Sequence, residues 1–136
     1  MIVSAALLCL SLNLYHEARG ESIMGQYAVA MVTLNRAKQD KRQVCEVVFK
    51  PKQFSWANKG VTKTRYGWKL DARHDPKDVY AWWLAKRIAK QSLTGRVIDF
   101  TRGSMFYHTT KVRPVWRHAL VPTRKIGNHQ FYSLPA

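Results

Sequence analysis

Apolar residues dominate two long runs at the start of the chain. Residues 2–14 are apolar apart from two serines and one asparagine, and 22–34 have little polar surface on any side. This pattern predicts two buried helices, over about 4–19 and about 22–38. Ser4 is a possible N-cap of the first helix, and Gly20 stands where that helix should stop.

Weaker signals follow in the middle of the chain. A short helix or turn is expected over 44–49, ended by Pro51. Residues 52–74 are polar, aromatic and interrupted by glycines, which indicates loops with a small hairpin.

The later part of the chain has one strong helix signal. Asp75 as N-cap and Pro76 at the first helical position predict a helix that runs to about Leu93. The C-terminal third carries Pro114 and Pro122, and we expect loops there with one or two short elements.

The first apolar run has neither the form of an export signal nor that of a membrane anchor. No Lys or Arg precedes it, and it is shorter than the roughly 20 residues that a transmembrane helix needs. The segment that follows, 15–21, is no small-residue cleavage site. We therefore expect synthesis in a bacterial or host cytoplasm without a signal peptide.

Composition indicates one globular domain with a basic surface. The chain has 136 residues, of which 46% are hydrophobic and 23% charged, and this excludes a disordered or fibrous class. With 23 Lys and Arg against 8 Asp and Glu, the net charge of +15 favours a polyanionic target such as nucleic acid, anionic lipid or an acidic cell-wall polymer. Cys9 and Cys45 lie in apolar stretches, where buried free thiols are expected.

Glu17 is the first candidate for chemistry. It shares a helix face with Leu10, Asn13 and Leu14, so its carboxyl comes at the C-terminal end of an apolar helix. Desolvation and the helix terminus both raise the pKa of such a carboxyl. A carboxyl that stays protonated near neutral pH can act as the general acid of glycosidic bond cleavage. Arg19 would oppose this shift if it lay close.

Other catalytic chemistries find little support. His16-Glu17 resembles the start of a zinc-protease motif, but the second His that the motif needs is replaced by Gly20. The other histidines lack short metal-ligand spacing, and there is no Gly-rich phosphate loop or nucleophile elbow. We therefore expect no metal and no cofactor.

Three later segments combine aromatic rings with hydrogen-bonding side chains, which suits sugar rings because the ring stacks and its hydroxyls are bound. The alternative is that these aromatics are ordinary core and loop residues. The candidates for substrate binding are Gln53, Ser55, Trp56, Tyr107, His108, His129 and Tyr132.

Taken in order along the chain, these segments resemble the SleB-type cell wall hydrolases, a family of spore cortex-lytic enzymes and related bacterial and phage proteins. The resemblance spans 6–132. The residues that carry it are 15–21, Gly25-Gln26, 28–30, Val32, 34–36, Val44-Cys45, Val47-Val48, 53–56, Asp99, Thr101, Gly103, Tyr107-His108, 112–114, Trp116, Ile126-Gly127, His129 and Phe131-Tyr132.

The resemblance implies an α+β, mostly helical, lysozyme-like fold with a small β element. It implies a single catalytic domain over 1–136, without a separate wall-binding domain, and a peptidoglycan lytic transglycosylase. Glu17 would protonate the oxygen between N-acetylmuramic acid and N-acetylglucosamine, and then accept the proton of the muramic 6-hydroxyl as a 1,6-anhydro ring closes. A muramidase-type hydrolase with the same acid is the alternative; it would need a second carboxylate, for which Glu21 and Asp99 are available.

The chain departs from the family pattern at three positions. Lys52 stands where many relatives have a Cys, which leaves Cys45 without that partner and a disulfide there unexpected. Phe106 stands where relatives often have a His, and Arg102 where a Gly is common. These changes concern substrate positioning and leave the acid in place.

A small, basic lytic domain most resembles a phage endolysin, released to the wall through a membrane lesion. We expect a monomer that is drawn electrostatically to the anionic envelope and has no specific nucleic-acid partner. A virion-borne or bacterial wall-remodelling enzyme is the neighbouring alternative. The competing class is a nucleic-acid-binding module without enzymatic activity. The net positive charge favours it, as do three basic residues on one helix, Lys86, Arg87 and Lys90. However, basic residues are spread along the whole chain, and the sequence has no nucleic-acid-binding motif.

Overall fold

The computed structural model describes residues 5–50, 61–64, 67–70 and 76–136. The helices are α1 (Ala5–Ala18), α2 (Ile23–Arg36), α3 (Val44–Val48) and α4 (Val79–Leu93), with short 3₁₀ helices η1 (Lys41–Gln43) and η4 (Val115–Ala119). The strands are β1 (Val61–Thr64), β2 (Gly67–Leu70), β3 (Phe106–Thr109), β4 (Val121–Ile126) and β5 (His129–Ser133).

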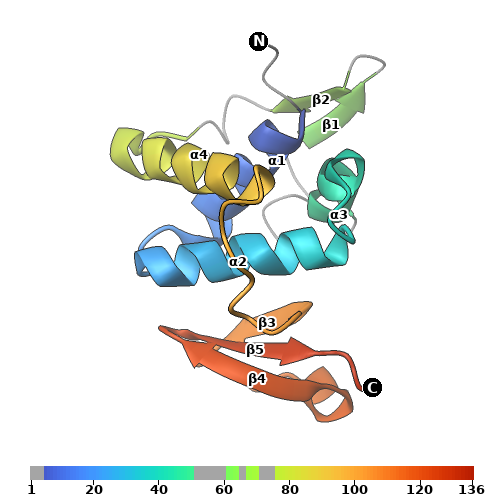
Figure 1. Cartoon of the computed structure of the whole chain (residues 1–136). Helices are drawn as coiled ribbons and strands as arrows, with labels where there is room; N and C mark the ends of the chain where they lie inside the picture. The colour runs from blue at the N-terminus through green and yellow to red at the C-terminus, as the bar shows by residue number, and fades with distance from the viewer. Residues whose placement is uncertain (1–4, 51–60, 65–66, 71–75) are drawn as a thin grey trace.

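Helix α1 is the centre of the helical part. It packs against α2, α3 and α4, and α2 lies between α4 and the three-stranded sheet (Figure 1). Leu10, Leu14 and Ala18 of α1 are fully buried. Inside this core the Asn13 side-chain amide donates to the Thr33 hydroxyl at 3.2 Å, which joins α1 to α2. The two helices predicted from the apolar runs are confirmed.

Helix α2 is buried along most of its length. Ser22 caps it by accepting a hydrogen bond from the Gly25 N–H at 3.0 Å. Its first turn departs from the expectation of a fully buried helix, because Ile23 and Met24 are more than half exposed.

Helix α4 begins at Val79, later than the expected first helical residue, Pro76. The phenol oxygen of Tyr15 accepts the backbone N–H groups of Lys77 and Asp78, so these groups are bound outside the helix. Asp78 is the N-cap, and its carboxylate accepts from the Ala81 N–H at 3.0 Å. Pro76 therefore precedes the helix, and the expected cap, Asp75, lies outside the described residues.

The middle and end of the chain form two antiparallel sheets. The expected hairpin is present as β1 and β2. The C-terminal third was expected to be mostly loops, and this is wrong: β3, β5 and β4 form a three-stranded sheet in that order. Pro122 lies in β4, an edge strand, where its missing N–H leaves the inner ladder intact. For this reason proline did not prevent a strand.

The two cysteines form a disulfide, which corrects the expectation of free thiols. Cys9 of α1 and Cys45 of α3 are bonded, with their Cα atoms 5.3 Å apart. Packing of α3 against α1 brings the two cysteines together. Because they are 36 positions apart in the sequence, local pattern could not predict this contact. The Cys that family resemblance places at 52 is therefore unnecessary for pairing Cys45.

None of the described helices combines the length and the apolar character that crossing a bilayer would require.

Candidate active site

Glu17 is the penultimate residue of α1 and is partly buried. Asn13 and Leu14, which lie on the same helix face one turn earlier, are fully buried. The helix ends at Ala18, and Gly20 then adopts a φ of +92°, a conformation that glycine enters without a Cβ penalty. The chain thus turns sharply and leaves the Glu17 carboxyl at the end of a buried helix.

Burial raises the pKa of Glu17 from 4.5 to about 7. The Tyr107 hydroxyl has the opposite effect and lowers this pKa, but it offsets the effect of burial only in part. The guanidinium of Arg19 is engaged elsewhere, because it lies 4.5 Å from the centre of the Tyr15 ring and donates to the Tyr15 hydroxyl. Near neutral pH a substantial fraction of Glu17 is therefore protonated. A carboxylic acid in this state can donate a proton to a leaving-group oxygen.

Tyr107 of β3 is the described side chain that acts most directly on Glu17. Its hydroxyl oxygen is buried and forms no hydrogen bond of good geometry within the described residues, so its interaction with Glu17 is a close polar contact. Burial and the Glu17 carboxyl raise the pKa of Tyr107 well above its usual value. The phenol thus remains a proton donor that favours the ionised form of Glu17.

His129 lies behind Tyr107. The two rings meet edge to face with centroids 4.9 Å apart, and the His129 side chain is almost fully buried. Its Nδ1 atom is 3.6 Å from Oε1 of Glu21, beyond hydrogen-bond distance. Burial lowers the pKa of His129, although Glu21 works against this. The neutral ring supports Tyr107 from the core side.

Glu21 and Asp99, the two carboxylates available for a second catalytic role, both accept hydrogen bonds from backbone and side-chain groups. Glu21 accepts from the backbone and side-chain N–H groups of Asn128, each at 3.2 Å. Asp99 accepts from Asn35 at 2.9 Å and from the N–H groups of Thr101 and Gly103. Burial alone would raise the pKa of Asp99, but these hydrogen bonds outweigh it and lower the pKa. Both carboxylates tie loops in place.

His108 and Tyr132 point to the other face of the sheet from Tyr107. Residues 107 and 108 are neighbours in β3 and so alternate in direction, and Tyr132 pairs with Phe106 in the strand register. His108 donates from Nδ1 to the Thr109 carbonyl, and its Nε2 accepts from the Tyr132 hydroxyl at 2.7 Å. Trp116 packs against both rings. The four C-terminal candidates therefore form two groups, Tyr107 with His129 and His108 with Tyr132.

Arg36 joins the surroundings of Tyr107, and only the family resemblance drew attention to it in the sequence. It ends α2, and its guanidinium lies 4.8 Å from the centre of the Phe106 ring. Burial lowers the pKa of Arg36. The positive charge of Arg36 in turn lowers the pKa of Tyr107, against the larger effect of burial there. A polar Asn-Arg pair that closes an apolar helix is the signal that could have identified it.

Three candidates, Gln53, Ser55 and Trp56, lie outside the described residues. No group of three or more His, Cys, Asp or Glu side chains in the described part of the chain is placed to hold a metal ion.

Comparisons with known proteins place the chain in a family. A family model described as cell wall hydrolase matches residues 20–132. The catalytic domain of the Bacillus cereus SleB protein is 25% identical with a TM-score of 0.70, over 95% of this chain and 90% of that one. The catalytic domain of the germination-specific lytic transglycosylase SleB from Bacillus anthracis is 24% identical with a TM-score of 0.72, over 97% of each chain. No curated protein sequence matches.

The two neighbours confirm the predicted fold class, since SleB catalytic domains have a lysozyme-like fold. The family match extends from the turn after α1 to the last strand. The chain therefore belongs to the cell wall hydrolase family and is a peptidoglycan-degrading enzyme.

Proposed function

We propose that the enzyme cleaves the β-1,4 bond between N-acetylmuramic acid and N-acetylglucosamine as a lytic transglycosylase, with Glu17 as acid and base. The observation that carries this proposal is the protonation of Glu17, which has a pKa of about 7 at the end of a buried helix. The carboxylates of Glu21 and Asp99 instead accept hydrogen bonds from loop N–H groups. The likeness to a lytic transglycosylase catalytic domain supports the same reaction.

The reaction needs one carboxyl group when the substrate supplies the nucleophile. Glu17 donates its proton to the glycosidic oxygen as the bond from that oxygen to C1 of the muramic residue breaks. The 6-hydroxyl oxygen of the same sugar then bonds to C1, and its proton passes to Glu17. The carboxylic acid is regenerated, no water is consumed, and the product ends in a 1,6-anhydro ring. A hydrolase would ordinarily use a second carboxylate to activate water or to attack C1.

The group around Tyr107 is proposed to position Glu17. Tyr107 faces the carboxyl, His129 supports its ring, and Arg36 lies beside it. His108 and Tyr132 form a separate polar-aromatic cluster with Trp116. Tyr132 is buried within it, and the exposed ring of Trp116 is the part of the cluster that suits stacking on a sugar. Gln53, Ser55 and Trp56 remain proposed substrate contacts on the resemblance alone.

Mass spectrometry of the muropeptides released from purified peptidoglycan tests the proposal. Anhydro ends, each lighter by one water than a hydrolysed end, are expected with the wild-type enzyme. Glu17→Gln should release almost nothing, because an amide is close to isosteric but cannot supply the proton. Reducing ends in place of anhydro ends would assign the alternative, a muramidase that uses the same acid. Full activity of Glu17→Gln would refute the role of Glu17.

We also propose that the enzyme acts in bacterial lysis, made in the cytoplasm and reaching the wall after the membrane is breached. The charge of +15 supports this, since the envelope is anionic and a basic enzyme gains a long-range attraction to it. Cells that express the enzyme should lyse when their membrane is permeabilised, and cells that express Glu17→Gln should not. Membership of an enzyme family excludes the alternative of a nucleic-acid-binding module without activity.

A further inference from the structure

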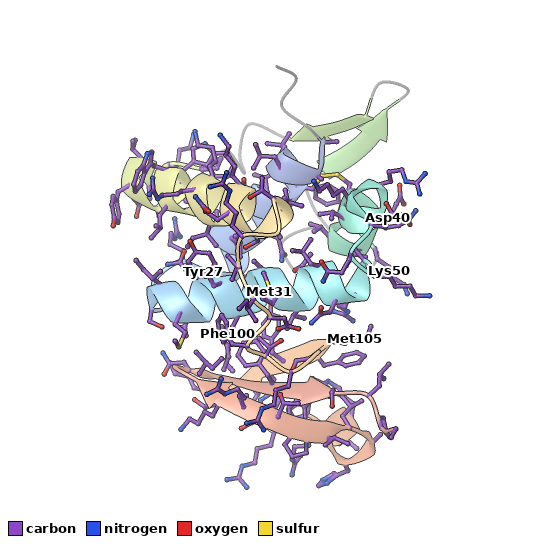
Figure 2. The ribbon with its side chains drawn as sticks, in the orientation of Figure 1. Tyr27, Met31, Asp40, Lys50, Phe100 and Met105 are labelled. Carbon is purple, nitrogen blue, oxygen red and sulfur yellow. A yellow bond between two sulfur atoms is a disulfide. The ribbon has the colours of Figure 1, made fainter. Side chains whose placement is uncertain are left out.

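An apolar patch lies outside the proposed site, where the first turn of α2 meets the segment that joins α4 to β3. Ile23, Met24 and Ile98 are 52%, 60% and 88% exposed. They surround a shallow hollow of about 480 Å³ that Tyr27 and Phe100 also line. Figure 2 labels Tyr27 on α2 and Phe100 on the joining segment. Exposed aliphatic side chains gathered in this way mark an interaction surface.

Cations border this patch on one side. Arg96 lines the apolar hollow and also a second hollow that it shares with Arg87 and Lys90 of α4. These three basic side chains are exposed, and none of them has a carboxylate partner among the described residues. The six residues Ile23, Met24, Ile98, Arg96, Arg87 and Lys90 form one continuous surface, which we call the Ile98 surface.

We propose that the Ile98 surface docks on anionic phospholipid bilayers, with its aliphatic side chains in the headgroup–acyl boundary and its arginines and lysine on the lipid phosphates. This combination is typical of proteins that lie on a membrane without crossing it. The charge of the surface is complementary to an anionic leaflet. A second copy of the chain is a poor occupant, because two molecules of net charge +15 repel each other.

An anionic polysaccharide fits less well, because exposed Ile and Met side chains gain little from a hydrated sugar chain. They gain free energy when they leave water for an acyl environment. The aromatic and cationic residues that continue along α4 extend the same surface: Trp83 is 50% exposed, with the Arg87 guanidinium 5.6 Å from its ring centre. Trp at the headgroup level is characteristic of membrane interfaces.

Vesicle sedimentation tests the proposal with the full chain. Vesicles of phosphatidylcholine alone are compared with vesicles that also contain phosphatidylglycerol. We expect binding to the anionic vesicles, which Ile98→Asp weakens about tenfold, as expected for a lost aliphatic contact and an added anion. Arg96→Gln should weaken it about fivefold, as for one cation at an anionic surface.

Matched controls separate the surface from the overall charge. Val115→Asp changes an aliphatic residue that is 82% exposed on η4, and Lys125→Gln removes an exposed cation from β4. Each control has the same charge change as its test variant and should bind nearly as well as the wild type. Ile98→Asp should keep its melting temperature and its activity on lipid-free walls, because Ile98 is exposed and outside the proposed site.

Equal losses in test and control variants would overturn the proposal, since net charge would then account for binding. Equal binding to both kinds of vesicle, or to neither, would also overturn it. A dimer in size-exclusion chromatography that Ile98→Asp abolishes would assign the surface to a second copy instead. Loss of activity on lipid-free walls would assign it to glycan binding.

Discussion

The Glu21 carboxylate accepts hydrogen bonds from both the backbone N–H and the side-chain amide of Asn128, across 107 positions of sequence. It thereby joins the turn between α1 and α2 to the turn between β4 and β5. The same carboxylate lies 3.6 Å from the buried His129 ring, which supports Tyr107. This carboxylate therefore helps to hold the helical part and the sheet in the relative position that brings Tyr107 to Glu17, together with the hydrogen bond from Asn35 of α2 to the Ser104 carbonyl.

Glu21→Ala should destabilise the protein and leave the reaction possible. Two hydrogen bonds are lost, but Asn128 is exposed and water can bind its N–H groups, so we expect a cost of about 1 kcal/mol. Thermal unfolding should show a lower melting temperature, while activity measured well below that temperature should persist. Complete loss of activity in a folded Glu21→Ala protein would show instead that Glu21 takes part in the chemistry.

Gly127→Ala tests the same junction from the other side. Gly127 has a φ of +57°, and a Cβ there would lie 3.0 Å from Oε1 of Glu21. Both the left-handed backbone and the close approach oppose a side chain, so we expect a loss of about 1–2 kcal/mol in the free energy of unfolding. Gly95→Ala is the control, because Gly95 also has a positive φ but nothing lies within 4 Å of its added Cβ. The junction is unimportant if the two variants lose equal stability.

Glu17→Gln should stabilise the protein at alkaline pH. Burial raises the pKa of Glu17 to about 7, above its value of 4.5 in the unfolded chain, so the folded state binds the proton more tightly. That stabilising effect is complete below about pH 4.5 and is lost as pH rises through about 7. Above pH 7 the wild type carries a cost of at most roughly 3 kcal/mol that the neutral amide avoids.

Chemical denaturation at two pH values measures this difference. Glu17→Gln should be more stable than the wild type at pH 8, and the difference should shrink towards zero at pH 4. A constant difference between the two proteins at both pH values would show that the Glu17 carboxyl is not shifted in the folded state.

Tyr107→Phe should move the pH dependence of lysis. Activity that requires protonated Glu17 should decline as pH rises past about 7, since the carboxyl ionises there. The Tyr107 hydroxyl lowers the pKa of Glu17, so its removal should raise that pKa and shift the decline to higher pH. Tyr132→Phe is the control, because its hydroxyl bonds to His108 on the other face of the sheet. A profile that shifts equally in both variants would contradict the contact.

Reduction of the Cys9–Cys45 disulfide should lower stability. The bond closes a loop between residues 36 positions apart, and the loop-entropy model assigns such a loop about 4 kcal/mol. A reducing agent should therefore lower the melting temperature of the wild type and leave that of a Cys9→Ala, Cys45→Ala double variant unchanged. Rapid reaction of both cysteines with a thiol reagent in the untreated native protein would show that the bond is absent.

The helical part of the fold could be derived from the sequence, because its information is local. Apolar runs of sufficient length predict α1 and α2, and Gly20 and Ser22 mark the boundary between them. The partial burial of Glu17 could be predicted for the same reason, since it follows from the helix face that Glu17 shares with Leu14.

The C-terminal sheet and the partners of Glu17 depended on tertiary structure. Pro122 suggested a loop, but its position at a sheet edge makes it tolerable in β4, and sheet order is a property of long-range pairing. The start of α4 was misjudged because Tyr15, more than sixty positions earlier, binds the N–H groups of Lys77 and Asp78.

Long-range contacts also decided the roles of residues whose identity was plain in the sequence. Cys9 and Cys45 pair because α3 packs on α1. Glu21 and Asp99 were equally available as second carboxylates until their hydrogen bonds to Asn128, Asn35 and Thr101 were known. Local sequence determines which face of a helix or strand a side chain occupies, whereas its burial and its polar partners come from distant elements that pack there. For Glu17 of α1, burial raises the pKa and Tyr107 of β3 lowers it in part.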